Sequence, residues 1–119
     1  MRQRNRYQVC GNLGADPQEF STKGGQKGCR FELCNNQTFG PPGNPQHRQN
    51  WFTVVVWNPR LVGLVLDSLE KGQAVQVEGE LRMREFNRIM TIDGAEIEVP
   101  TRSYDLIASQ IRPDTRLGS

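Results

Sequence analysis

The stretch Trp51-Phe52-Thr53-Val54-Val55-Val56-Trp57 decides the fold of this chain. It is aromatic and β-branched and contains no glycine or proline, which is the composition of a β-strand. Successive side chains of a strand point to opposite faces, so Phe52, Val54 and Val56 share one face, which we expect to lie in the core. The other face carries an indole at each end, and these two rings are roughly 20 Å apart.

Two large flat rings on the face away from a β core are what a stacking platform for unpaired bases requires. The alternative is that Trp51 and Trp57 pack in the core or against a second subunit. For a single tryptophan this alternative is the more common outcome, so the functional interpretation depends on the residues that accompany the pair.

Length and composition predict one soluble globular domain. The chain has 119 residues, of which 24% are charged and 35% hydrophobic, and no apolar run approaches membrane-spanning length. The basic segment 1–6 is not followed by an apolar region, so we expect no secretory signal and a cytoplasmic, nucleoid-associated protein, with an organellar form left open. The net charge of +2 is too small to identify a polyanionic partner by itself.

The sequence predicts neither an enzyme nor a metal or cofactor site. Cys10, Cys29 and Cys34 form no CxxC pair and are expected to be reduced and mostly buried. A single histidine without a cluster of carboxylates and cysteines gives little support for a metal centre. Phosphate-binding, dinucleotide-binding and hydrolase motifs are absent, and a nuclease would need a carboxylate cluster that the sequence does not show.

The pattern of the chain is three strands, a short helix and two strands, without repeats. This order is typical of an all-β, five-stranded OB-fold barrel, which we assign to residues 1–112, followed by a short polar tail at 113–119. Asn58 and Pro59 are expected to begin the helix, and Lys71-Gly72 to end it. The expected strands occupy residues 6–13, 28–37, 51–57, 75–84 and 104–111.

Two irregular segments interrupt this pattern. The run Gly40-Pro41-Pro42-Gly43-Asn44-Pro45 predicts a long loop over Thr38–Asn50, which carries Phe39, His47 and Arg48. Residues 89–99 predict an extended hairpin that turns at Asp93-Gly94 and is ended by Pro100. Its apolar face needs a cover, which we expect to be a neighbouring subunit or DNA. That face is formed by Met90, Ile92, Ala95 and Ile97.

The strongest chemical pattern is Arg82, Arg84, Phe86 and Arg88 at every second position of one strand. Their spacing places three cations and one ring on one face, which suits phosphates and a base between them. The alternative is a solvated strand edge that arginine protects from aggregation. Glu78 and Glu80 share that face and would repel phosphates, so DNA should avoid them or subunit contacts should occupy them.

Phe39, at the start of the loop, is a further candidate ring, and the alternative is a simple anchor for the loop. His47 and Arg48 in the same loop are candidate phosphate contacts. The full set of candidate cations is Arg6, Arg30, Arg48, Arg82, Arg84 and Arg88.

Several segments together resemble the bacterial-type single-stranded DNA-binding proteins. Val9-Cys10-Gly11-Asn12-Leu13-Gly14-Ala15-Asp16-Pro17 resembles the opening strand and GNLGxDP motif of that family, and Trp51–Trp57 resembles its WxxVVx-aromatic strand. Glu70–Arg82 resembles its KGxxVxVEGxLR segment, and Asp105–Ile111 is similar to its closing strand. The matches are in order and cover most of the chain.

This resemblance implies an OB-fold, a homotetramer built as a dimer of dimers, and sequence-tolerant binding of single-stranded DNA in replication, recombination and repair. By motif position, the four base-stacking aromatics of the family fall on Phe39, Trp51, Trp57 and Phe86.

Two departures from the family pattern bear on function. The acidic, hydrophobic-tipped tail that recruits partners in the family has no counterpart in Arg116-Leu117-Gly118-Ser119, and the segment around residues 89–99 is longer than usual. An alternative therefore stays open, an accessory or primosomal OB-fold protein that acts mainly through protein contacts.

Overall fold

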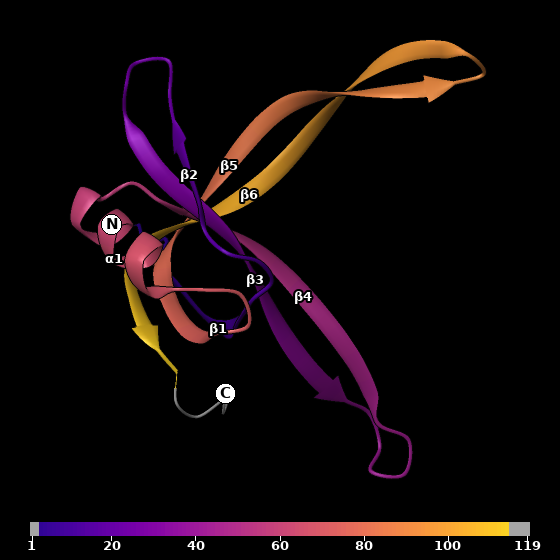
Figure 1. The fold of residues 1–119 in the computed structure, drawn as a ribbon. Helices are drawn as coiled ribbons and strands as arrows, with labels where there is room; N and C mark the ends of the chain where they lie inside the picture. The colour runs from indigo at the N-terminus through magenta and orange to yellow at the C-terminus, as the bar shows by residue number, and fades with distance from the viewer. Residues whose placement is uncertain (1–2, 115–119) are drawn as a thin grey trace.

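The computed structural model describes residues 3–114, which form a six-stranded sheet that closes into a barrel (Figure 1). The strand order is β1-β5-β6-β4-β3-β2, and a further pairing of β1 with β3 closes the ring. The predicted all-β, five-stranded OB-fold barrel is confirmed. The elements are β1 (Tyr7–Leu13), β2 (Gln18–Ser21), β3 (Lys27–Phe39), β4 (Gln46–Val56), α1 (Pro59–Ser68), β5 (Ala74–Ile92) and β6 (Ala95–Pro113).

The core lies where alternation along β4 predicts it. Val54 and Val56 are completely buried, and Phe52 packs against them with part of its ring exposed. Val55 belongs to the opposite face, yet it is also buried, because it forms part of the floor of a cleft. One face of β4 therefore fills the barrel, while the other builds a shaped outer surface.

The helix α1 begins and packs as its sequence predicts. The Asn58 side-chain oxygen accepts hydrogen bonds from the backbone N–H groups of Arg60 (3.0 Å) and Leu61 (3.3 Å), and Pro59 occupies the first turn. Val62 and Val65 are buried in the barrel core. Tertiary packing and a good N-terminal cap thus hold a helix of only ten residues.

The two segments that resemble family motifs at residues 9–17 and 70–82 meet beside the end of β1. The Asp16 carboxylate accepts a hydrogen bond from the backbone N–H of Lys71 at 2.8 Å. The backbone N–H of Gly72 donates to the Leu13 carbonyl at 2.8 Å, and the Leu13 N–H donates to the Gln73 carbonyl at 3.0 Å. These bonds fasten the turn before β5 to the turn after β1.

The expected loop over Thr38–Asn50 is wrong in its extent. β3 continues to Phe39 and β4 begins at Gln46, with Cα partners from Cys29↔Val56 to Phe39↔Gln46, so only residues 40–45 form the turn. The resulting two-stranded arm projects from the barrel (Figure 1). It has no apolar alternation because neither of its faces is buried, and the ladder of backbone hydrogen bonds holds it instead. The short strand β2 was not predicted.

The second arm is formed by β5 and β6. Its predicted turn is confirmed: Asp93 and Gly94 both have positive φ, 52° and 78°, which suits a two-residue turn of the primed type. The expectation that Pro100 ends the strand is wrong, because β6 runs through it with Pro100 opposite Asn87. A two-stranded arm tolerates proline, since half of its N–H groups point away from the partner strand.

The apolar tip of this arm has the predicted arrangement. Met90 lies opposite Ile97 and Ile92 opposite Ala95, so the four side chains share one face. All of them are exposed, and no other element within residues 3–114 covers them.

A β-bulge separates the barrel part of β5 and β6 from the arm. Glu78 lies opposite Gln110 and Gly79 opposite Ala108, which leaves Ser109 as the extra residue. The backbone of β6 approaches Gly79 so closely that a Cβ atom there would lie 1.9 Å from the Ile107 carbonyl oxygen. Gly79 is therefore required by a close approach of two main chains.

We predict that Gly79→Ala destabilises the protein by about 3 kcal/mol, because main-chain atoms must move to admit the methyl group. The matched control is Gly63→Ala in α1, where a Cβ would meet nothing within 4 Å. That change should stabilise the protein by about 1 kcal/mol through helix propensity. Urea unfolding of both variants measures the two effects, and equal behaviour of the two would contradict the close approach.

Burial also acts on a thiol of β3. Burial raises the pKa of Cys29 to about 11 from its usual value near 9, and the Glu19 carboxylate adds to the rise. The folded state therefore keeps its proton where the unfolded state has lost it, so the free energy of unfolding falls as the pH rises from about 9 to 11.

We predict that Cys29→Ala removes this part of the pH dependence. Urea unfolding between pH 8 and pH 11 should show the stabilities of the wild type and the variant converging as pH rises. Parallel curves would mean that the Cys29 thiol ionises in the folded protein as it does in the unfolded chain.

Candidate nucleic-acid interface

The outer side chains of β4 continue across its neighbours as one sheet face. Thr53 lies between Glu32 of β3 and Asp105 of β6 in the strand register. Two residues further along β4, Val55 lies between Arg30 of β3 and Ile107 of β6. Partner residues of adjacent strands point to the same side of a sheet, so β3, β4 and β6 share an outer face.

This face is hollowed into an open cleft of about 450 Å³. Rings, cations and acceptors line it together, which is the composition of a site for a planar polar ligand. The polar and aromatic residues that line the cleft are Gln18, Glu19, Phe20, Arg30, Thr53, Trp57, Arg84 and Asp105.

Trp57 forms an aromatic wall of the cleft. The Phe20 ring from β2 packs edge-on against the indole, with ring centroids 5.1 Å apart and an angle of 86° between the planes. Trp57 stays partly exposed. A neighbour that holds the indole by an edge contact fixes its orientation while leaving surface for a ligand.

Trp51 is supported in a different way. A Cβ atom on Gly14 would lie 2.6 Å from the Cζ3 atom of Trp51, so the indole rests directly on a glycine backbone. The Trp51 side chain is nevertheless 54% exposed. The prediction that both indoles lie outside the barrel core is therefore consistent with the structure, in which the two rings differ in exposure.

Phe39 and Phe86 lie on the two arms, each beneath an arginine. The guanidinium carbon of Arg48 is 4.8 Å from the Phe39 ring centroid, and that of Arg84 is 5.1 Å from the Phe86 ring centroid. The two rings are 38% and 39% exposed. Cation–π contacts of this kind place a positive charge beside a surface on which a base can stack.

The strand register separates Phe39 from Trp51. Phe39 is opposite Gln46 and Arg48 is opposite Gln37, whereas Trp51 is opposite Cys34. Since β3 and β4 pair without a bulge, odd-numbered and even-numbered positions on each strand stay on opposite sides. A strand of nucleotides that reached both Phe39 and Trp51 would therefore have to pass around the β3–β4 arm.

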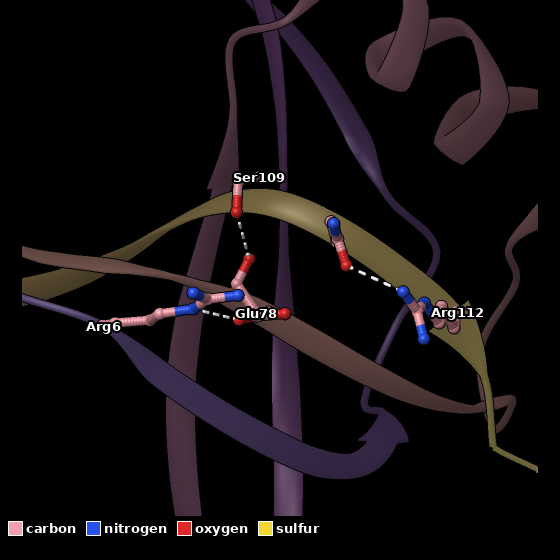
Figure 2. A network of polar contacts seen from close by, with 5 residues as sticks. Arg6, Glu78, Ser109 and Arg112 are labelled. Atoms are coloured by element: carbon pink, nitrogen blue, oxygen red, sulfur yellow. Dashed lines mark hydrogen bonds and ion pairs between the residues drawn. The ribbon is translucent and has the colours of Figure 1, made fainter.

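Three of the candidate arginines form ion pairs. Arg84 Nε lies 3.3 Å from Asp105 Oδ2, and an Arg82 nitrogen lies 2.6 Å from Glu80. Arg6 pairs with Glu78 (Figure 2). Both carboxylates expected to repel phosphates are thus neutralised by neighbours. Within residues 3–114, no ion pair is found for Arg30, Arg48 or Arg88.

Figure 2 shows the surroundings of Glu78 on the barrel part of β5 and β6. The hydroxyl of the bulged Ser109 donates to the Glu78 carbonyl at 3.1 Å, and Arg112 donates to the Gln110 side chain at 3.0 Å. The Arg6 guanidinium therefore lies in a polar network away from the cleft, because Glu78 and Arg6 are not among the residues that line it.

The sequence pattern singles out neither Phe20 nor Asp105 of the cleft, nor Glu32, which lies beside Thr53 but does not line the cleft. Phe20 belongs to the unpredicted strand β2, whose four residues are too few to show a period. Asp105 and Glu32 were placed on strands, but only the register brings them beside Thr53. His47, a candidate phosphate contact, lies on the arm with its Nδ1 atom 3.2 Å from the Thr38 hydroxyl.

The described residues contain no other candidate centre. Among residues 3–114, no group of three or more His, Cys, Asp or Glu side chains is arranged to hold a metal ion. The ten-residue α1 is too short to cross a bilayer, and no other helix occurs within the same residues.

A closed barrel of this topology, with a cleft and exposed rings on its outer face, defines the OB-fold class of small β-barrels. The chain belongs to the single-strand binding protein family, whose model matches residues 4–111.

Known proteins agree with this assignment. The chain is 33% identical over 90 residues to "Single-stranded DNA-binding protein 1" of Chlorobaculum tepidum, covering 75% of this chain and 55% of that protein. It is 27% identical over 103 residues to the single-stranded DNA-binding protein of Rhizobium meliloti, covering 85% and 59% of the two chains. The chain thus spans little more than half the length of these relatives.

Two solved structures share the fold. One is the SSB of Plasmodium falciparum in complex with single-stranded DNA, with a TM-score of 0.76 at 24% identity over 95% of this chain and 96% of that chain. The other is a small single-stranded DNA-binding protein from Streptomyces coelicolor, with a TM-score of 0.67 at 24% identity and the same coverage.

The different supports of the two indoles predict different accessibility to a quencher. We expect acrylamide to quench Trp51, measured in a Trp57→Phe variant, more strongly than Trp57, measured in Trp51→Phe. Trp51 is 54% exposed, whereas Trp57 is only partly exposed and packs against the Phe20 ring. Resistance of both indoles to quenching would show that the rings are closed to any ligand.

Proposed function

We propose that this protein binds and protects single-stranded DNA without catalysis and with little dependence on sequence, during replication, recombination and repair. Bases stack on Phe39, Trp51, Trp57 and Phe86. Arginine side chains contact the phosphates that connect these bases. The observation that carries the proposal is the cleft between Trp57 and Arg84, with exposed Trp51 on the same sheet face.

The contacts around the rings support this assignment. Arg48 and Arg84 each lie over a phenylalanine ring, so each of these two stacking surfaces has a positive charge beside it. Arg30 lines the cleft without an ion pair within residues 3–114 and is available for a phosphate. The named relatives are single-stranded DNA-binding proteins, which agrees with the chemistry of the face.

We further propose a cytoplasmic homotetramer built as a dimer of dimers. Within residues 3–114, β1 pairs with β5 from Tyr7 to Asn12 but with β3 only at Asn12 and Leu13, so one edge of β1 is open over its first residues. An open edge is a ready surface for a second copy. The uncovered tip of the β5–β6 arm is a further surface for a neighbouring subunit or for DNA.

The alternative function is an accessory or primosomal OB-fold protein that acts mainly through protein contacts. Such a protein has no need of rings that stay exposed beside arginines. The exposed Trp51, Phe39 and Phe86 therefore favour DNA binding.

We predict that Trp51→Ala and Trp57→Ala each weaken binding of a dT oligonucleotide by about 1–3 kcal/mol, because each removes a stacked base. Arg84→Ala should weaken binding for all sequences and reduce the salt slope by about one. Titration of intrinsic fluorescence at two salt concentrations measures both effects, and a native mass measurement of the same sample should show four chains.

Two substitutions serve as matched controls. Tyr104→Ala removes an exposed ring that lies opposite Met83, on the other side of the β5–β6 arm from Arg84 and Phe86. Arg102→Ala removes a cation on that same other side. Losses of affinity as large in these controls would assign DNA binding to a different surface, and loss of stability without loss of affinity in Trp51→Ala would assign that ring to the core.

A further inference from the structure

The short edge strand β2 carries a single apolar side chain, that of Phe20. β2 has four residues, pairs with β3 alone, and is exposed except at Phe20, which is half-buried. The Phe20 ring belongs neither to the hydrophobic core of the barrel nor to the partly buried side chains that pack against that core. Its burial therefore does not serve the barrel and needs another explanation.

A glycine on β3 allows Phe20 to reach Trp57. Phe20 is the strand partner of Gly28, and Trp57 directly follows the last residue of β4, which pairs with the other edge of β3. Strands two apart in a sheet lie about 10 Å from each other, so these rings meet only if no side chain stands on the strand between them. A Cβ atom on Gly28 would lie 2.9 Å from Phe20 Cζ and 3.1 Å from Trp57 Cε3. Both rings therefore pack over the bare Gly28 backbone.

The contact between the two rings has a defined geometry. Their centroids are 5.1 Å apart, their planes are nearly perpendicular, and both rings line the cleft. The hairpin that carries Phe20 is itself held at its turn, where the Thr22 N–H donates to the Gln26 carbonyl at 2.9 Å and the Gly25 N–H donates to the Thr22 carbonyl at 3.0 Å. Trp57, which lies just beyond the end of its own strand, thus takes support from the neighbouring β2–β3 hairpin.

We propose that Phe20 is a positioning residue for DNA binding, which holds the Trp57 indole in the orientation in which a base stacks on it. This inference rests on the proposed function, since it concerns the same cleft and the same single-stranded DNA. An indole that is already ordered loses less conformational entropy when a base stacks on it, so the edge contact raises affinity. Phe20 acts through Trp57 in this role.

The test is a double-mutant cycle, with affinity for a dT oligonucleotide measured at one salt concentration. Phe20→Ala in the wild type should raise the dissociation constant about three- to tenfold, the range expected when one side chain must be ordered on binding. In a Trp57→Ala background the same change should have an effect of less than about twofold, because the indole that Phe20 holds is gone. Equal losses in the two backgrounds would mean that Phe20 does not act through Trp57, which would overturn the inference.

A second measurement follows the indole itself. In a Trp51→Phe background, Trp57 is the sole tryptophan of the chain. Phe20→Ala should lower the fluorescence anisotropy of Trp57 in the free protein, because the released ring gains motion on the nanosecond timescale. Trp51, observed in a Trp57→Phe background, should keep its anisotropy, since it rests on Gly14. The matched control is Ser21→Ala, which changes an exposed residue on the opposite face of β2 and should alter neither measurement.

Phe20→Leu preserves the test if Phe20→Ala does not fold, because leucine keeps apolar bulk beside Gly28 and removes the aromatic edge. It should give the same pattern in both measurements. An unchanged anisotropy of Trp57, or an unchanged affinity for dT, in the Phe20 variant would overturn the inference while leaving DNA binding intact. Failure of the wild type to bind dT would instead overturn the proposed function.

Discussion

The closure of the barrel through β1 is the constraint on which the other features depend. β1 pairs with β5 over six positions but with β3 over only two, Asn12↔Cys34 and Leu13↔Leu33. The approach is so close that a Cβ on Gly11 would lie 2.3 Å from the Cys34 carbonyl oxygen. Closure buries the inner side chains of β1, β3, β4, β5 and β6, and it thereby turns the alternate residues of β3, β4 and β6 outward onto one face.

Beyond the barrel, strand pairing alone positions the candidate rings Phe39 and Phe86. The strands β3–β4 and β5–β6 continue as two-stranded arms, and Phe39 and Phe86 lie on these arms instead of on the core. Both faces of a two-stranded arm are free, and odd-numbered and even-numbered residues of a strand point to opposite faces, so a residue's position in the strand decides on which face it lies. The β-bulge at Ser109 changes the register where the second arm leaves the barrel, and so it determines which residues stand opposite Arg82 and Arg84.

The sequence predicts the parts of this structure that are buried on one side. Val54, Val56, Val75 and Val77 alternate with polar residues, and that period locates strands that form a core. Residues 46–50 are largely exposed on both sides, so their sequence carries no such period and predicts a loop. Residues 95–99 do alternate and predict a hairpin strand, but Pro100 was expected to end it, so the continuation of β6 through residues 100–103 was not predicted. The cleft depends on the parallel pairing of β4 with β6, which joins Thr53 to Asp105 across a long separation that no local pattern records.

The charges of the interface explain how a chain of net charge +2 can serve a polyanion. Arg6, Arg82 and Arg84 are held by carboxylates in the free protein, and all three guanidinium groups remain largely exposed. Exposed ion pairs contribute little free energy, so a phosphate can replace the carboxylate at small cost. The ion pairs thus orient the arginines in the free protein, and under the proposed function DNA binding releases them from the carboxylates.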